Sequence, residues 1–126
     1  MNTKIEKKIL VIDDDLDALD TLQMILEMSG YTVLTATCGK SGIRLAWEQK
    51  PDMIILDVMM PDMDGYQVCE IIKTDAVTKN IPIIMLTGRD MGDDVALALD
   101  KKADWFVTKP YDIKYLMSKI SSFING

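Results

Sequence analysis

Short apolar runs alternate with longer amphipathic stretches along this chain. The candidate strands lie at roughly 8–13, 32–37, 52–57, 82–86 and 104–108. Continuous apolar runs of this length, bounded by turn residues, are typical of strands in a parallel sheet that is buried on both faces. The remaining stretches predict helices at roughly 15–28, 40–49, 65–74, 92–101 and 112–124.

Regular alternation of strand and helix predicts an α/β fold. Such a chain forms right-handed crossovers and a doubly wound parallel sheet with helices on both faces. We therefore expect five parallel strands and five flanking helices. A strand order of 2-1-3-4-5 would place the ends of the first and third strands side by side.

Four of the predicted strands are followed or ended by polar residues that can bind phosphate or a metal ion. Asp13 ends the first strand and Asp14 follows it, Asp57 ends the third, Thr87 follows the fourth and Lys109 follows the fifth. In sheets of this kind, ligands bind just beyond the carboxyl ends of the strands. These side chains are therefore expected at one edge of the sheet.

Asp13, Asp14 and Asp57 form a candidate metal site. Two carboxylates about 4 Å apart repel by roughly 4 kcal/mol at an effective dielectric constant of about 20. A cation or a proton relieves this repulsion. Oxygen-only ligands in a chain without histidine favour Mg²⁺, or else Mn²⁺. Asp15 and Asp17 are interpreted instead as capping the following helix.

A carboxylate beside a divalent ion is a plausible nucleophile toward phosphorus, which makes Asp57 the candidate acceptor. Lys109 supplies a cation for phosphoryl oxygens, and Thr87 supplies a hydroxyl donor. Taken singly, a strand-end threonine and a surface lysine also have ordinary structural explanations.

Composition narrows the possible functions. The chain has 126 residues, 48% of them hydrophobic, a net charge of −6 and no histidine. The negative charge argues against direct binding to nucleic acid, and the lack of histidine excludes Ser-His triads and histidine-bound zinc. No apolar run has the length of a signal peptide or membrane helix. We expect one cytoplasmic domain over 1–126, with no output domain in this chain.

Together these stretches resemble the receiver domain of two-component response regulators, over essentially the whole chain. The matching stretches are 9–14 (ILVIDD), 56–65 (LDVMMPDMDG), 86–87 (LT) and 108–110 (TKP). Each is weak alone, but their order and spacing are specific. The resemblance implies a flavodoxin-like fold and a phosphoryl-accepting signalling switch.

The resemblance also implies roles for individual residues. Asp57 would accept a phosphoryl group from a sensor histidine kinase or phosphotransfer protein. Asp14 would bind Mg²⁺ directly, Asp13 through water, and Met59 through its backbone carbonyl. The domain would assist its own phosphorylation and dephosphorylation, without turning over an outside substrate as an enzyme does.

Further implied features concern the other strand ends. Lys109 would pair with the phosphoryl group, and its bond to Pro110 is expected to be cis. Thr87 would move toward the phosphoryl group, and Phe106 would fill the space released. A permanently buried core ring is the alternative for Phe106.

The resemblance places the output on the face formed by 92–101, 104–108 and 112–124, which would bind an unknown downstream target. The expected state is a monomer or a phosphorylation-dependent dimer. Trp105 replaces an acidic residue that is usual in the DNA-binding subclass, so it is a candidate partner anchor; a surface tryptophan is the alternative. Met59 and Arg89 flank the site and are candidates for tuning the phosphoryl lifetime.

Three other functions fit the sequence less well. A phosphatase acting through an aspartyl phosphate would need a threonine at Asp17. A phosphate-independent module of this fold usually lacks one or more of the site residues. Here all five are present: Asp13, Asp14, Asp57, Thr87 and Lys109. A calcium-binding loop would need glycine at Ala18 and glutamate at Met24.

Overall fold

The computed structural model describes residues 6–58, 60, 62–88 and 103–125. Within these ranges the chain forms five strands and four helices. They are β1 (Lys8–Ile12), α1 (Leu16–Met28), β2 (Thr32–Ala36), α2 (Gly39–Gln49), β3 (Met53–Asp57), α3 (Gly65–Thr74), β4 (Ile83–Thr87), β5 (Trp105–Thr108) and α5 (Ile113–Asn125). The helix expected at 92–101 lies outside the described residues, as do Met59 and Arg89.

The five strands form one sheet in the order β2-β1-β3-β4-β5, and every neighbouring pair is parallel. The predicted strand order is therefore confirmed. The register aligns the strand ends: Ile12 pairs with Leu56, so Asp13 and Asp57 follow at the same level. Thr87 pairs with Thr108, directly before Lys109.

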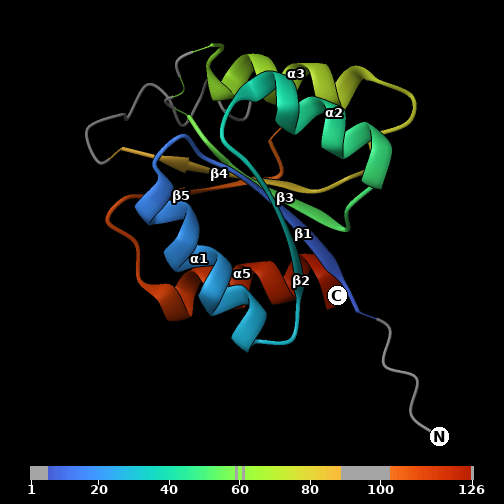
Figure 1. Ribbon diagram of the computed structural model, residues 1–126. Coiled ribbons are helices and arrows are strands. Elements are labelled where there is room, and N and C mark those ends of the chain that lie inside the picture. Colours follow the sequence, from blue (N-terminus) through green and yellow to red (C-terminus); the bar gives the residue numbers. More distant parts are fainter. Residues whose placement is uncertain (1–5, 59, 61, 89–102, 126) are drawn as a thin grey trace, which may run out of the picture.

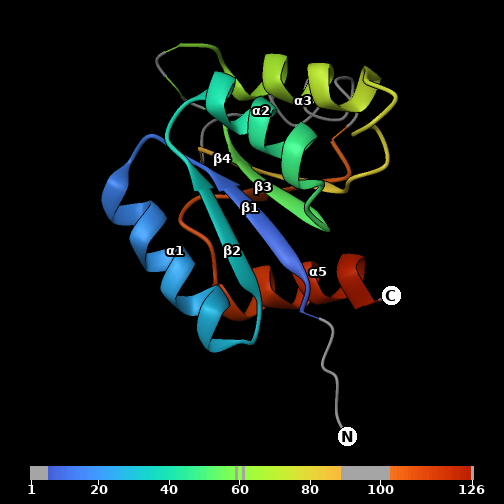
Figure 2. The same ribbon diagram turned by 45° about the vertical axis from the view of Figure 1, so that its right-hand side comes forward.

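Helices cover both faces of the sheet, as predicted. Figures 1 and 2 show α1 and α5 on one face and α2 and α3 on the other. The central strand β3 supplies both cores, because successive side chains point to opposite faces. Ile55 packs in the core under α1 and α5, whereas Ile54 packs in the core under α2 and α3; both are fully buried.

Local signals explain where the helices begin and end. The Asp15 carboxylate accepts hydrogen bonds from the backbone N–H groups of Asp17 and Ala18, which caps α1 as expected. Gly30 follows this helix with a φ of 97°, a left-handed conformation that favours glycine. Asp64 and Gln67 form a capping box at the start of α3.

The longest described helices, α1 and α5, have 13 residues each. None of the described helices is both long enough and apolar enough to cross a membrane.

Candidate functional site

Three carboxylates meet where β1 and β3 end. One carboxylate oxygen from each of Asp13, Asp14 and Asp57 lies within 4.8 Å of the others. Asp13 and Asp57 are buried, whereas Asp14 is exposed. The parallel pairing of β1 with β3 brings these residues together, because both strands end at the same edge. All-oxygen ligands at this spacing suit a small, hard cation such as Mg²⁺.

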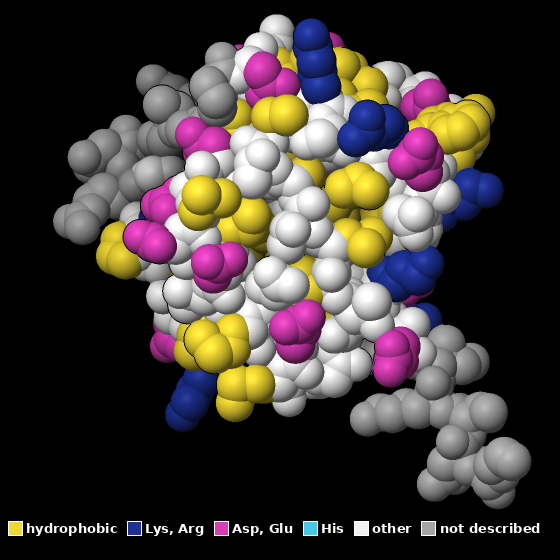
Figure 3. Space-filling model, viewed as in Figure 1, with side chains coloured by type: hydrophobic (Ala, Val, Ile, Leu, Met, Phe, Trp, Pro, Cys, Tyr) yellow, Lys and Arg dark blue, Asp and Glu magenta, His cyan; other side chains and the backbone are white. Residues whose placement is uncertain are grey.

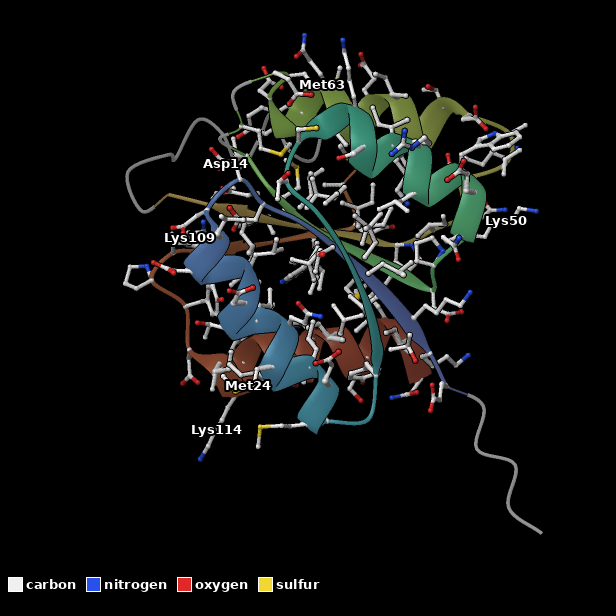
Figure 4. All side chains as sticks on the ribbon, viewed as in Figure 1. Asp14, Met24, Lys50, Met63, Lys109 and Lys114 are labelled. Carbon is white, nitrogen blue, oxygen red and sulfur yellow. The ribbon has the colours of Figure 1, made fainter. Side chains whose placement is uncertain are left out.

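Lys109 brings a positive charge to the same group. Its Nζ lies 3.1 Å from Asp57 Oδ1, in a hydrogen-bonded ion pair. The backbone N–H of Lys109 donates to the carbonyl of Thr87 at 2.6 Å, which ties the end of β5 to the end of β4. The bond to Pro110 is cis, as expected. Figure 4 shows Lys109 and Asp14 at the same end of the sheet.

The pKa of Asp13 reflects its burial beside a second carboxylate. Burial raises the pKa of its carboxyl from 3.8 to about 6, and the neighbouring Asp57 carboxylate contributes to the rise. A hydrogen bond of 2.9 Å from the backbone N–H of Asp15 opposes the shift, as does the charge of Lys109. The site therefore holds more negative charge than Lys109 alone offsets, and a bound cation would relieve it.

The hydroxyl of Thr87 is buried beside the carboxylates of the site. Thr87 is 1% exposed, and its Oγ1 has no hydrogen-bond partner among the residues that the structure describes. A buried hydroxyl without a partner costs about 1–3 kcal/mol. Thr87 follows Leu86, which is paired with Asp57, so its hydroxyl is available to an acceptor oxygen bound at this edge.

The segment that follows Asp57 is packed closely against it. The backbone N–H of Gly65 donates to the carbonyl of Val58 at 2.8 Å. A Cβ at position 65 would lie 2.6 Å from the backbone oxygen of Asp57 and 2.8 Å from Val58 Cα. Because both obstacles are backbone atoms, a glycine is required where α3 begins.

Acidic side chains continue outward from the site. In Figure 3 they gather along the left edge of the molecule, the end at which Figure 4 places Asp14. Two other aspartates, Asp15 and Asp62, each bind a helix N-terminus. Asp15 caps α1, and Asp62 accepts from two backbone N–H groups of α2.

Two long-range interactions were missed by the sequence analysis. One is the bond between Asp62 and α2. The other is an ion pair of 2.6 Å between Lys73 and Asp104. Neither leaves a local pattern, because the partners are more than twenty residues apart. The capping box at Asp64, by contrast, follows a local acidic-x-x-Gln pattern that could have been used.

The strand β5 carries two aromatic residues, Trp105 and Phe106. Phe106 is partly buried against the core under α2 and α3, and its ring stacks with Trp105 at a centroid separation of 6.0 Å. The indole N–H of Trp105 donates to the Tyr115 hydroxyl at 3.2 Å. Lys119 Nζ lies 4.6 Å from the centroid of the Trp105 ring. Trp105 therefore already makes contacts within this chain.

Comparisons with known proteins point to one protein family. The model of the response regulator receiver domain family matches residues 9–121. A curated relative, the DNA-binding dual master transcriptional regulator RpaA of Synechocystis, is 38% identical over 93% of this chain. The alignment covers 48% of RpaA, so the chain spans about half the length of this relative.

Solved structures of receiver domains have the same fold. The receiver domain of a signal transduction histidine kinase from Syntrophus aciditrophicus is 35% identical, with a TM-score of 0.89 over 95% of this chain and 91% of its own. A CheY-like receiver domain protein from Methanospirillum hungatei is 29% identical, with a TM-score of 0.87 over 96% and 95%. The chain belongs to the response regulator receiver domain family of two-component signal transduction.

Proposed function

We propose that this protein is a phosphorylation-dependent switch in which Asp57 is the phosphoryl acceptor. The observation that carries the proposal is the convergence of Asp13, Asp14 and Asp57 with Lys109, whose ammonium group lies 3.1 Å from Asp57. The unpartnered hydroxyl of Thr87 supports it, because this hydroxyl has no acceptor among the described residues.

Asp13, Asp14 and Asp57, with the backbone carbonyl of Met59, would hold the metal ion. When bound, Mg²⁺ (or Mn²⁺) neutralises charge on the carboxylates and on the phosphoryl oxygens. Asp14 is the exposed member and is suited to direct binding, while the buried Asp13 would act through water.

The phosphoryl donor would be a phosphohistidine on a sensor kinase or phosphotransfer protein. A carboxylate oxygen of Asp57 attacks phosphorus in line, and the P–N bond breaks with its electron pair leaving on the imidazole. Lys109 exchanges part of its contact with Asp57 for a phosphoryl oxygen, and Thr87 donates its hydroxyl to another. Water later cleaves the aspartyl phosphate, with Met59 and Arg89 proposed to tune this step.

The output would be a change in the face around β5 and α5. Movement of Thr87 toward the phosphoryl group would let the Phe106 ring turn inward, which shifts the population of this face toward its active state. An unknown downstream target would bind there, with Trp105 as an anchor. RpaA binds DNA as a protein about twice this length, so no nucleic-acid contact is assigned to this chain.

The alternative, a phosphatase mechanism, is disfavoured because the Asp15 carboxylate already caps α1. That mechanism needs a second acidic group two residues after Asp13 to exchange protons with the substrate. Here the Asp15 carboxylate is held by two backbone N–H groups at the start of α1.

The direct test is intact-mass measurement after incubation with Mg²⁺ and acetyl phosphate. We expect one added phosphoryl group in the wild-type protein, none in Asp57→Ala, and none when Mg²⁺ is chelated. The exposed-acid variant Asp20→Ala is the matched control and should be phosphorylated like the wild type. An unmodified wild type, or equal modification of Asp57→Ala, would refute the assignment.

A further inference from the structure

The start of α2 lacks an ordinary cap. Its N-cap residue, Cys38, makes no side-chain hydrogen bond to the helix N–H groups, and its thiol instead lies 3.2 Å from the Ser41 hydroxyl. A helix usually receives this hydrogen bond from the side chain of its own N-cap residue. In this protein the acceptor comes from a distant part of the chain.

That acceptor is Asp62. Its Oδ1 accepts a hydrogen bond from the backbone N–H of Gly39 at 2.9 Å, and its Oδ2 accepts one from that of Lys40 at 3.0 Å. These bonds hold the pKa of the Asp62 carboxyl below its ordinary value. The carboxylate is therefore ionised at neutral pH, and both of its oxygens are engaged by one helix end.

Asp62 lies between the proposed acceptor Asp57 and α3, in a segment of which the structure describes residues 58, 60 and 62–64. The two ends of this segment are held near the site: Val58 donates to the backbone of Leu86 at 3.2 Å, and Gly65 donates to Val58. The hydrogen bonds that Asp62 accepts join this segment to a different element, α2.

Close packing accompanies these hydrogen bonds. A Cβ at Gly39 would lie 2.4 Å from Met63 Cγ and 2.9 Å from Val68 Cγ2, so the missing side chain at Gly39 allows the segment to approach α2. Figure 4 shows Met63 on the side of the sheet that α2 and α3 cover. Polar and steric contacts thus fasten the same stretch to the same helix end.

We propose that Asp62 is a positioning residue: by tying the segment after Asp57 to the N-terminus of α2, it sets the Mg²⁺ affinity of the site. This inference rests on the proposed function. A segment that is already held before the cation binds does not have to be ordered at binding, so its conformational entropy is not lost at that step. A segment released from α2 would weaken metal binding.

A substitution pair separates positioning from simple helix capping. Asp62→Ala removes both the cap of α2 and the tie to the segment. Adding Cys38→Asp restores a cap from the usual position and returns the net charge to that of the wild type, but does not restore the tie. Glu48→Ala, an exposed acid near the other end of α2, is the control for loss of one charge.

The readouts are Mg²⁺ affinity by titration calorimetry, thermal unfolding in chelator, and the phosphorylation rate with acetyl phosphate at limiting Mg²⁺. We expect Asp62→Ala to weaken Mg²⁺ binding about tenfold, the size typical of lost supporting contacts at a metal site. The double variant should regain thermal stability but remain weak in Mg²⁺ binding and slow in phosphorylation.

Two results would overturn the inference: unchanged Mg²⁺ affinity in Asp62→Ala, or recovery of both stability and affinity in the double variant. Should Asp62→Ala fail to fold, Asp62→Asn serves instead, because its amide keeps one acceptor oxygen and is expected to give an intermediate affinity. Failure of the wild type itself to bind Mg²⁺ and accept phosphate would refute the proposed function, which is a distinguishable outcome.

Discussion

Adjacent aspartates of this site differ in character because their burial differs. Asp13 is 3% exposed and has a raised pKa, whereas Asp14, the next residue, is exposed. Thr87 shows the same dependence on burial. Its hydroxyl destabilises the fold only because it is buried and has no hydrogen-bond partner within the described ranges. Side-chain chemistry at this scale is therefore set by position as much as by residue type.

Asp13→Asn should change how the stability of the metal-free protein depends on pH. The folded-state pKa is raised, so Asp13 favours folding fully below its ordinary pKa of 3.8 and loses that contribution as pH rises through about 6. Above pH 6 the neutral variant should be more stable by about 1–3 kcal/mol. Urea unfolding of both proteins across this range should show the difference shrinking toward acid; a constant difference would contradict it.

Thr87→Val should separate stability from switching. Valine keeps the shape of threonine but removes a buried hydroxyl that has no partner among the described side chains and backbone groups. The unmodified protein should therefore gain about 1 kcal/mol in free energy of unfolding. The phosphorylated protein should lose the extra stabilisation that the hydroxyl gives in the wild type. Urea unfolding with and without phosphodonor measures both effects, with Thr87→Ser as the control that retains the hydroxyl.

At the scale of secondary-structure elements, the side chains of Lys73 and Asp104 connect α3 with the starts of β4 and β5. Lys73, in the last turn of α3, lies 2.6 Å from the Asp104 carboxylate and donates to the carbonyl of Ile81 at 2.7 Å. Asp104 also accepts from the backbone N–H of Ile83 at 2.7 Å. One lysine therefore links the end of α3 with the beginnings of β4 and β5.

Lys73→Met should destabilise the fold without altering the chemistry of the site. Removing one partner of a buried ion pair costs about 3–5 kcal/mol. Because the Asp104 side chain is 32% exposed, we expect the lower value of about 2–3 kcal/mol after solvent screening. Denaturant unfolding checks the loss against Lys79→Met, an exposed lysine nearby. A loss below 1 kcal/mol would show that the pair is not important for stability.

At the scale of the molecule, the described residues form a sheet of five parallel strands whose carboxyl ends lie at one edge. Two packed faces hold this edge in place, while the carboxylates gathered on it repel one another. A ligand that binds there would bind the folded chain and not the unfolded one. Metal binding and global stability are therefore coupled.

Mg²⁺ should stabilise the whole protein. At a Mg²⁺ concentration a hundred times the Kd, the free energy of unfolding should rise by about 2.7 kcal/mol. Thermal unfolding with and without chelator measures the effect, and Asp14→Asn should reduce it, whereas Asp20→Asn should not. A melting temperature that does not respond to Mg²⁺ would contradict the proposed metal site.

Local patterns allowed much of this structure to be predicted. The apolar run at 53–56 indicated a buried strand, and handedness rules then limited the strand order. Boundaries were less certain: the first strand was expected at 8–13 but ends at Ile12, and the second helix begins at Gly39 rather than 40. The convergence of Asp13 with Asp57 could be predicted, because the parallel strands that carry them end at the same edge of the sheet.

Residue order alone thus determined the alternation of strand and helix, the edge at which the polar strand ends lie and the types of side chain found there. Only the tertiary structure decided that Asp62 binds the N-terminus of α2 and that Lys73 pairs with Asp104. It also decided that the Thr87 hydroxyl is buried with no hydrogen-bond partner in the part of the chain that the structure describes. The physical reason is distance along the chain. Periodicity acts over a few residues, whereas burial and long-range hydrogen bonds arise when distant segments pack together.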